Sequence, residues 1–318
     1  MSVDILVGDC RTRLAELPDQ SVQMCVTSPP YFGLRDYGHD GQIGLEQTPD
    51  AFVAELVSVF RAVKRVLRDD GTLWLNLGDS YSSFKDQSSR QQTLAGKSRD
   101  EPHSGKAANR NGEVLARCGL KNKDIIGIPW RVAFALQADG WYLRQDIIWH
   151  KPNPMPESVK DRCTKAHEYI FLLSKSERYY YDSDAISEDL QGPAHALCNK
   201  AASDAGHLRN DVGTERMQKI WGESGKRNKR SVWTVTTSPY KGAHFATFPP
   251  DLIEPCIKAG SKAGDTVLDP FGGAGTTGLV ADRLGRNAVL CELNPTYAEL
   301  AENRIRQDNA LFAEVMRK

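Results

Sequence analysis

The sequence lacks the features of secreted, disulfide-bonded and membrane-spanning proteins. No apolar run approaches the length of a transmembrane helix, and the first residues lack the basic and apolar segments of a signal peptide. The seven cysteines are odd in number, scattered over 318 residues and without a C-x-x-C pair, which argues against a disulfide framework and a zinc site. We therefore expect a soluble, cytoplasmic protein that contacts no membrane and holds no metal.

The sequence also lacks an excess of either charge. Lys and Arg together number 41, and Asp and Glu together also number 41. A chain without net charge has no overall field that attracts a polyanion. Contact with a nucleic acid would therefore have to depend on local groups of basic residues.

Apolar strand-like runs alternate with amphipathic helices along most of the chain. A helix over residues 49–67, capped by Thr48 and stopped by residues 69–71, is the strongest single prediction. Strands are expected at residues 3–9, 21–31, 71–79, 141–150, 167–181, 266–268 and 287–293, and further helices at about 128–139, 249–259, 276–284 and 296–310. This alternation predicts an α/β fold with a mainly parallel sheet covered by helices. The pattern disappears in two irregular, basic regions, at about residues 80–124 and 183–240.

A glycine-rich turn lies between a strand and a helix near the end of the chain. Residues 273–278, GAGTTG, satisfy the dinucleotide-binding pattern G-x-G-x-x-G, and Glu292 ends the next strand. Glycines let a ligand approach the backbone, and the acid could accept hydrogen bonds from two ribose hydroxyls. The alternatives are a nicotinamide-cofactor site, for which too little sheet follows, and a tight turn, which would not need the lead-in of residues 269–271.

A serine, two prolines and an aromatic residue stop the apolar run that ends at Thr27. Amino nitrogens of adenine and cytosine are poor nucleophiles because their lone pairs are conjugated with the ring. The Ser28 oxygen and a carbonyl held rigid by Pro29 and Pro30 could accept the amino protons, and Tyr31 could stack on a flipped base. An isolated S-P-P is more often only the end of a strand, but its occurrence together with the glycine loop favours the catalytic interpretation.

Together these motifs resemble those of the DNA amino-methyltransferases that use S-adenosylmethionine, in the permuted order of the beta class. TSPPY, residues 27–31, is similar to the catalytic tetrad of that family, and DPFGGAGTT, residues 269–277, is similar to its methyl-donor loop. The resemblance implies a three-layer Rossmann-like methyltransferase fold with a mostly parallel sheet, a circularly permuted motif order and an irregular target-recognition region. It divides the chain into a catalytic part, 1–182, with an inserted basic loop at about 80–124, a target-recognition region, 183–240, and a donor-binding part, 241–318.

The resemblance also assigns roles to individual residues. Glu292 matches the ribose-binding acid, and Asp9 matches a position near the adenine of the donor. The implied catalytic residues are Ser28, Pro29, Pro30 and Tyr31, and the implied donor-binding residues are Asp9, Cys10, Phe248, Asp269, Pro270, Phe271, Gly272, Gly273, Gly275, Thr276, Thr277, Glu292 and Asn294. His244 and Pro249 are further candidates, although core packing explains His244 and Phe248 equally well.

Three further features each have two interpretations. Pro255-Cys256 resembles the nucleophile of cytosine-carbon methyltransferases, but its place inside a predicted amphipathic helix favours a buried structural cysteine. Residues 35–38 either close over a flipped base or form a connecting turn. A third group ends a strand on the expected active-site side and either lines the base pocket or only marks a loop: Trp149, Lys151 and Asn153.

The implied reaction transfers the methyl group of S-adenosylmethionine to an exocyclic amino group of a flipped base in double-stranded DNA, without a metal. A tetrad serine is frequent in cytosine N4 enzymes, whereas residues 28–38 as a whole resemble adenine-modifying members, so adenine N6 is slightly favoured. DNA contact is expected for residues 183–240, which include the basic run 226–230, with the earlier insertion assisting. A homodimer is common in the resembled class. The alternatives are an RNA or protein amino-methyltransferase and a non-catalytic DNA-binding regulator.

Overall fold

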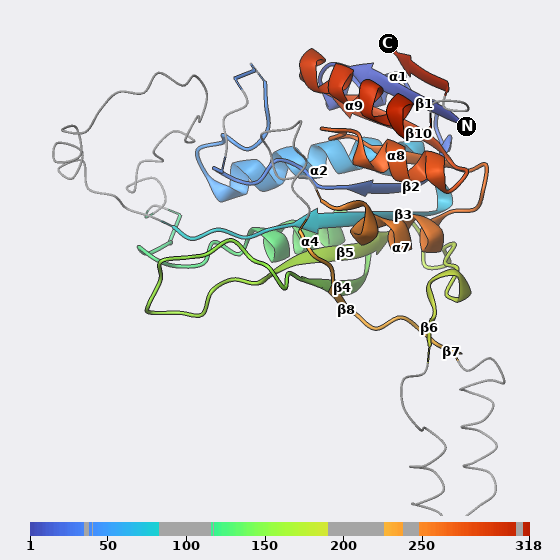
Figure 1. Cartoon of the computed structure of the whole chain (residues 1–318). Coiled ribbons are helices and arrows are strands. Elements are labelled where there is room, and N and C mark those ends of the chain that lie inside the picture. The colour runs from blue at the N-terminus through green and yellow to red at the C-terminus, as the bar shows by residue number, and fades with distance from the viewer. Residues whose placement is uncertain are drawn as a thin grey trace, which may run out of the picture.

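The computed structural model of the chain describes residues 1–34, 38–39, 41–82, 116, 118–189, 226–237, 248–309 and 314–318 (Figure 1). Within them, the main sheet consists of β1 (Ser2–Val7), β2 (Val22–Thr27), β3 (Leu67–Leu77), β4 (Tyr142–His150), β5 (His167–Ser174), β8 (Val232–Thr234), β9 (Thr266–Asp269), β10 (Asn287–Glu292) and β11 (Glu314–Arg317). The strand order is β11-β1-β10-β9-β2-β3-β5-β4-β8.

The sheet is mostly parallel, as the sequence predicts. All neighbouring strands from β11 to β3 are parallel, and so are β4 and β8. Only β5 runs antiparallel to both of its neighbours, β3 and β4. The first residues of β5 therefore lie at the same edge of the sheet as the last residues of β2 and β3.

The order of the strands brings the two ends of the chain together. β1 pairs with β10, with Val7 opposite Glu292, and β2 pairs with β9, with Cys25 opposite Leu268. The segment that follows β2 and the loop that follows β9 consequently leave the sheet side by side. This arrangement confirms the predicted permuted, Rossmann-like fold.

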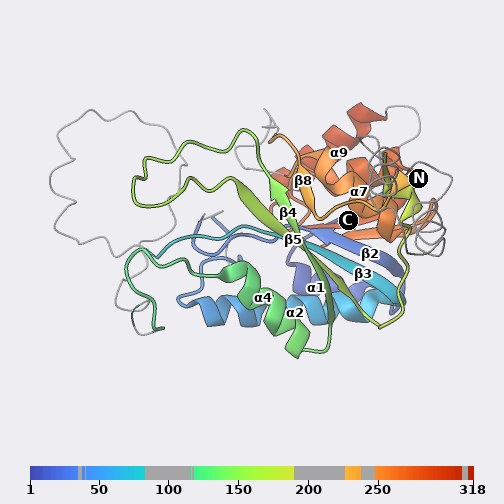
Figure 2. The ribbon, with the colours of Figure 1, turned by 90° about the horizontal axis from the view of Figure 1, so that it is seen from below.

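Helices cover both faces of the sheet, which makes three layers (Figure 2). One face carries α1 (Cys10–Glu16), α2 (Pro49–Val66) and α4 (Ile128–Ala138), and the other carries α7 (Pro250–Gly260), α8 (Thr276–Arg283) and α9 (Pro295–Asp308). Each helical layer has its own cluster of buried apolar residues against the sheet. None of the helices in the described residues combines the length and apolarity that crossing a membrane requires.

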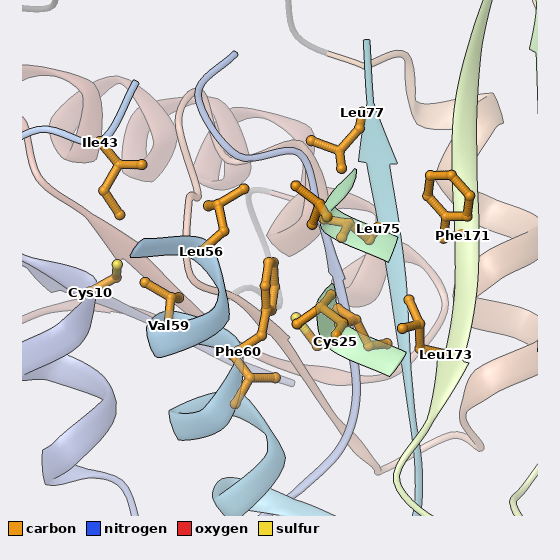
Figure 3. Packing of buried hydrophobic residues seen from close by; sticks show 14 of the residues in the cluster. Cys10, Cys25, Ile43, Leu56, Val59, Phe60, Leu75, Leu77, Phe171 and Leu173 are labelled. Carbon is orange, nitrogen blue, oxygen red and sulfur yellow. The ribbon is translucent and has the colours of Figure 1, made fainter. Parts of the chain in front are cut away.

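The helix α2 shows how the sequence pattern produces this packing. Its residues Leu56, Val59 and Phe60 are fully buried, and they belong to one cluster with the sheet residues Leu75 and Leu173 (Figure 3). The predicted cap is present, since the Thr48 hydroxyl accepts a hydrogen bond from the Ala51 backbone N–H at 3.1 Å. Apolar spacing at one helical face and a capping side chain at its start are together sufficient to place this element.

Several boundaries differ from the prediction. The helix α2 ends at Val66, and residues 69–71 belong to β3, where the register with β2 shifts, instead of forming a turn. The region 183–240 is not wholly irregular, because it contains the 3-10 helix η2 (Asp184–Ile186), the pair β6 (Glu188–Asp189) and β7 (Lys226–Arg227), and the sheet strand β8. The edge strand β11 was not predicted at all. Such short strands carry too few residues for periodicity to detect.

The inserted loop starts and ends at one point of the fold. Tyr81 forms a β-bridge with Ile125, the Ser82 N–H donates to the Asp124 carbonyl at 2.8 Å, and the Ile126 N–H donates to the Ser80 carbonyl at 3.0 Å. Backbone hydrogen bonds therefore hold the two ends of the insertion next to each other. Residues 83–115 and 117 lie outside the described residues.

Candidate active site

A cavity of about 810 Å³ opens where the carboxyl ends of the parallel strands meet. It is lined by residues that follow β1, β2, β9 and β10, and by residues from the adjoining ends of β3, β4 and β5. Of the residues predicted to form the site, those in the lining are Asp9, Cys10, Ser28, Pro29, Pro30, Tyr31, Phe248, Asp269, Pro270, Phe271, Gly272, Gly273, Thr276, Glu292 and Asn294. The two motifs that lie more than 200 residues apart in the sequence thus share one cavity.

Gly275 and Thr277 do not line this cavity. Gly275 has a φ of 75° and caps α8 against α9, where a Cβ atom would lie 2.7 Å from the Cβ of Ala301. The Thr277 hydroxyl points inward and donates to Asp269. Both residues support the loop by packing and hydrogen bonding, and their predicted contact with a donor stays a prediction. The motif does not distinguish a glycine that a ligand approaches from one that a neighbouring helix approaches.

The loop after β9 presents its backbone to the cavity at Gly273. This residue has a φ of 50°, and a Cβ atom there would meet nothing nearer than the Phe271 carbonyl oxygen at 3.9 Å. Its N–H donates to Glu292 Oε2 at 2.8 Å, and the Gly272 N–H donates to the Cys291 carbonyl at 2.8 Å. The loop is therefore fixed to β10, and the open space in front of Gly273 can accept a ligand close to the main chain.

Glu292 is a largely buried acid at the end of β10. Its Oε1 accepts from the Asn294 N–H at 2.8 Å, while its Oε2 accepts from Gly273. Burial raises the pKa of the Glu292 carboxyl, and these two backbone donors act in the opposite direction. Each carboxylate oxygen retains capacity for another donor, which fits the two hydroxyls of a ribose.

The side chain of Asp269 connects the end of β2, before residues 28–31, with the loop after β9. It is 1% exposed, and its Oδ1 accepts from the Thr27 hydroxyl at 2.6 Å and from the Phe271 N–H at 3.0 Å. Its Oδ2 accepts from the Thr277 hydroxyl at 2.6 Å. Burial raises the pKa of this carboxyl, against the effect of the hydroxyl donors. The side chain joins β2 to β9 and α8, so it holds the start of the tetrad beside the donor loop.

Asp9 and Cys10 form the wall of the cavity that follows β1. The Asp9 carboxylate caps α1 by accepting from the Arg11 N–H at 2.8 Å, and it also pairs with the Arg11 guanidinium. The hydrogen bonds from Arg11 hold the pKa of Asp9 below its usual range, so this carboxyl is ionised at neutral pH. Burial raises the pKa of the Cys10 thiol to about 12, which makes a thiolate role at this position unfavourable.

The segment of residues 28–31 leaves β2 into the cavity and is braced from two sides. The Gly33 N–H donates to the Gly44 carbonyl at 2.8 Å, and a Cβ atom on Gly44 would lie 3.3 Å from the Tyr31 carbonyl oxygen. The Tyr31 hydroxyl donates to Glu168 Oε2 at 2.7 Å and lies 3.3 Å from Asn76 Oδ1. The ring of Tyr31 therefore has a defined position in the cavity.

Some residues of the cavity lining were not given a definite role from the sequence. Trp149 and Lys151 line the cavity at the end of β4, and Asn153 follows them, hydrogen-bonded to the backbone of Thr237. No role was assigned from the sequence to Asn76, next to last in β3, or to Glu168, second in β5, although both line the cavity. Glu168 lies at the start of β5, and the sequence could not predict that it lines the cavity. An apolar run does not reveal the direction of its strand.

The remaining predicted features have different outcomes. Cys256 is fully buried within α7 and its thiol donates to the Leu252 carbonyl, which confirms the structural interpretation. Residues 35–37 and His244 lie outside the described residues.

Three side chains of the basic run 226–230 surround the carboxylate of Glu188, at distances of 3.2 to 3.6 Å: Arg227, Lys229 and Arg230.

Known proteins are similar to this chain over most of its length. A family model described as DNA methylase matches residues 22–303. The chain is 48% identical over 302 residues to the type II methyltransferase M.Cfr9I of Citrobacter freundii, which covers 95% of this chain and 87% of that protein. TTHA0409 of Thermus thermophilus, solved in complex with S-adenosyl-L-methionine, is 26% identical with a TM-score of 0.60 and covers 99% and 98% of the two chains. PvuII DNA methyltransferase, named as cytosine-N4-specific, has the same fold, with 19% identity, a TM-score of 0.62 and coverage of 99% and 96%.

Proposed function

The chain belongs to the DNA methylase family, and we propose that it methylates the N4 amino group of a cytosine in duplex DNA. As a member of this family it is a type II DNA amino-methyltransferase that depends on S-adenosylmethionine. The observation that carries the proposal is the shared cavity, in which the segment 28–31 faces the same space as the loop 269–273. A base and a methyl donor held there would meet without a rearrangement of the sheet.

We assign the part of the cavity beside β10 and β1 to the donor. Glu292 would accept hydrogen bonds from its ribose hydroxyls, and the open space at Gly273 would take its methionine part near the backbone. Asp9 lies on the neighbouring wall, where we expect the adenine. When bound, S-adenosylmethionine supplies a methyl group activated by its sulfonium centre. Gly275, Thr277 and Asp269 would contribute by holding the loop in shape.

We assign the residues after β2 to the target base. The Ser28 hydroxyl oxygen and the Pro29 carbonyl would accept the two amino protons, which draws the nitrogen toward a tetrahedral geometry and frees its lone pair. Pro30 limits the freedom of the backbone at this point, and Tyr31 offers its ring for stacking. The nitrogen forms a bond to the methyl carbon as the bond from that carbon to sulfur breaks, and one amino proton leaves to solvent. No covalent bond to the protein is required.

Two observations support cytosine over adenine, for which the sequence had a slight preference. Ser28 is the tetrad residue frequent in cytosine N4 enzymes, and the cytosine-N4-specific PvuII enzyme has this fold. In addition, Lys151 lines the cavity, its side chain is 17% exposed and its ammonium group pairs with Glu168. Beside its amino group a cytosine carries two acceptors, N3 and O2, whereas adenine carries N1 followed by a carbon-bound hydrogen. A lysine has three donors and suits the cytosine edge better.

The proposal includes the three-part division of the chain. Residues 1–182 and 241–318 form the catalytic and donor parts, and DNA contact by the region 183–240 and by the insertion 80–124 remains our expectation. Two copies of the chain acting as a homodimer, the absence of a metal and a cytoplasmic location likewise remain predictions.

The reaction is tested by incubating the purified protein with unmethylated genomic DNA and isotopically labelled S-adenosylmethionine, followed by digestion and mass spectrometry of the nucleosides. We expect labelled N4-methylcytosine, and no label when the DNA has first been incubated with unlabelled donor. Labelled N6-methyladenine would overturn the choice of base while leaving the reaction class intact. If no label enters the DNA although calorimetry shows that the protein binds the donor, the proposal that the protein methylates DNA is wrong.

A further inference from the structure

One side of the Tyr31 ring lies against Gly78, which directly follows β3. A Cβ atom built on Gly78, directly after β3, would lie 2.5 Å from Tyr31 Cε2 and 3.2 Å from its Cζ. Real Cβ atoms do not approach so closely, so the ring occupies space that any other residue at position 78 would fill. The Cδ2–Cε2–Cζ side of the ring therefore lies close against the chain at Gly78, which limits how far the ring can turn.

The edge of the same ring is held by a buried acid. Glu168 Oε2 accepts from the Tyr31 hydroxyl at 2.7 Å, and the Asn76 side-chain amide donates to the same oxygen at 3.3 Å. The other oxygen, Oε1, pairs with the ammonium of Lys151. The side chains of this ion pair are only 17% and 14% exposed. Hydrogen bonds to a partly buried carboxylate are stronger than those between neutral groups.

Glu168 is itself fixed by its surroundings. It sits second in β5 and pairs with Trp149 in β4, and the Lys151 ammonium lies 4.1 Å from the centre of the Trp149 ring. Trp149 in turn donates its indole N–H to the Val235 carbonyl at 2.8 Å. The carboxylate thus has little freedom to turn away from Tyr31.

We propose that Glu168, together with Gly78, is a positioning element that fixes the plane of the Tyr31 ring so that the target base stacks in line with the methyl donor. The inference rests on the proposed function. In this proposal Glu168 is a positioning residue that acts on the reaction through the Tyr31 hydroxyl. A ring that is already immobile loses no further freedom when the base stacks on it, so the reacting nitrogen is held in a narrow range of positions.

A double-mutant cycle tests this dependence. Glu168→Ala and Tyr31→Phe are made singly and together, and kcat and KM for DNA and the Kd of S-adenosylmethionine are measured for each. We expect each single change to lower kcat/KM for DNA about 10- to 100-fold, with the donor Kd unchanged. In the Tyr31→Phe background, the additional loss from Glu168→Ala should disappear, and Glu168→Gln should restore most of the activity because it retains an acceptor.

Glu254→Ala is the matched control. Glu254 forms an exposed ion pair with Lys258 at 2.6 Å within α7, remote from the cavity lining. It should leave all three parameters unchanged.

The outcomes separate this inference from the proposed function. Equal losses from Glu168→Ala in the wild-type and Tyr31→Phe backgrounds would overturn the positioning role while the enzyme still methylates DNA. A wild-type protein that does not methylate DNA would overturn both. Where Glu168→Ala does not fold, as judged by donor binding, Gly78→Ala replaces it. Its expected loss of kcat/KM should be absent in a Tyr31→Ala background, and its persistence there would reject the proposal.

Discussion

In the proposed reaction the Ser28 hydroxyl contacts the reacting amino group. Ser21, at the other end of the same strand, is a control position for it. Ser28 follows the last residue of β2, whereas Ser21 precedes the first residue of the same strand and donates to the Pro18 carbonyl at 2.8 Å. Ser28→Ala removes an acceptor for an amino proton without changing the donor end of the cavity. We expect kcat to fall about 100-fold or more, with the Kd of S-adenosylmethionine unchanged in calorimetry.

Ser21→Ala should leave both kcat and donor affinity at wild-type values. The assigned role of Ser28 would be wrong if Ser28→Ala reduced donor affinity as strongly as turnover, because that result would place the hydroxyl at the donor.

Glu292 should make donor binding sensitive to mild acid. Burial raises the pKa of its carboxyl, and only the ionised form offers both oxygens as acceptors to the ribose. As the pH falls through this raised pKa, the carboxyl takes up a proton and donor affinity should decrease, at a higher pH than an ordinary glutamate would produce. Calorimetric titrations of donor binding at a series of pH values measure the midpoint.

Glu292→Gln provides the reference for this pH effect. It should bind the donor more weakly at neutral pH and show no change over the range where the wild-type affinity falls. An unaltered pH profile in this variant would transfer the effect to another acid, for which Asp269 at the end of the neighbouring strand β9, whose pKa burial also raises, is an alternative.

At the scale of elements, the buried contact between Thr27 and Asp269 joins β2 to β9 and α8. Thr27→Val keeps the shape of the side chain but leaves Asp269 Oδ1 with only the Phe271 N–H as a donor among the contacts described. A buried acceptor deprived of a donor destabilises a protein by about 1–3 kcal/mol. Chemical denaturation should show a loss of this size in the free energy of unfolding for Thr27→Val. Thr234→Val, on the exposed edge strand β8, should change it by less than about 0.5 kcal/mol.

The elements that the sequence predicts well are those with long, regular patterns. The helix α2 is an example, and so are the strands before the tetrad and before the glycine loop, where an apolar run ends in turn-forming residues. The site motifs were found because they lie directly after such strands. A strand of three or four residues such as β8 or β11 carries no usable periodicity, so these edge strands were missed.

The direction of β5 could not be predicted from the sequence. An apolar run such as residues 170–173 of β5 is equally compatible with a parallel and an antiparallel neighbour. Only the antiparallel direction brings Glu168, at the start of β5, to the edge where Asn76 and the tetrad lie. The acid beside Tyr31 could therefore not be predicted before the sheet order was known. At Gly275 the structure adds a packing reason for the glycine that the motif alone does not reveal, because α9 approaches it closely.

At the scale of the whole molecule, a chain without net charge must bind a polyanion through local surfaces. The segment 151–166 between β4 and β5 leaves the sheet at the cavity, and its residues 153–156 belong to the lining. Figure 1 shows this segment extending outward on the side opposite β6 and β7. The basic run 226–230 is partly neutralised by Glu188, whereas the segment 151–166 carries the exposed Lys160, which makes no ion pair with the residues described. This segment is therefore the better candidate for phosphate contact beside a flipped base.

Lys160→Ala tests that placement of the duplex through the salt dependence of binding. Each phosphate neutralised by a protein cation contributes about −0.9 to the slope of log K against log salt concentration. We expect Lys160→Ala to weaken binding to DNA of any sequence and to reduce the magnitude of that slope by about one, measured by fluorescence anisotropy across a salt series. Lys258→Ala, in the last turn of α7 and outside the cavity lining, should leave the slope unchanged. An unchanged slope for Lys160→Ala would remove this segment from the DNA surface and return the expected contact to the region 183–240.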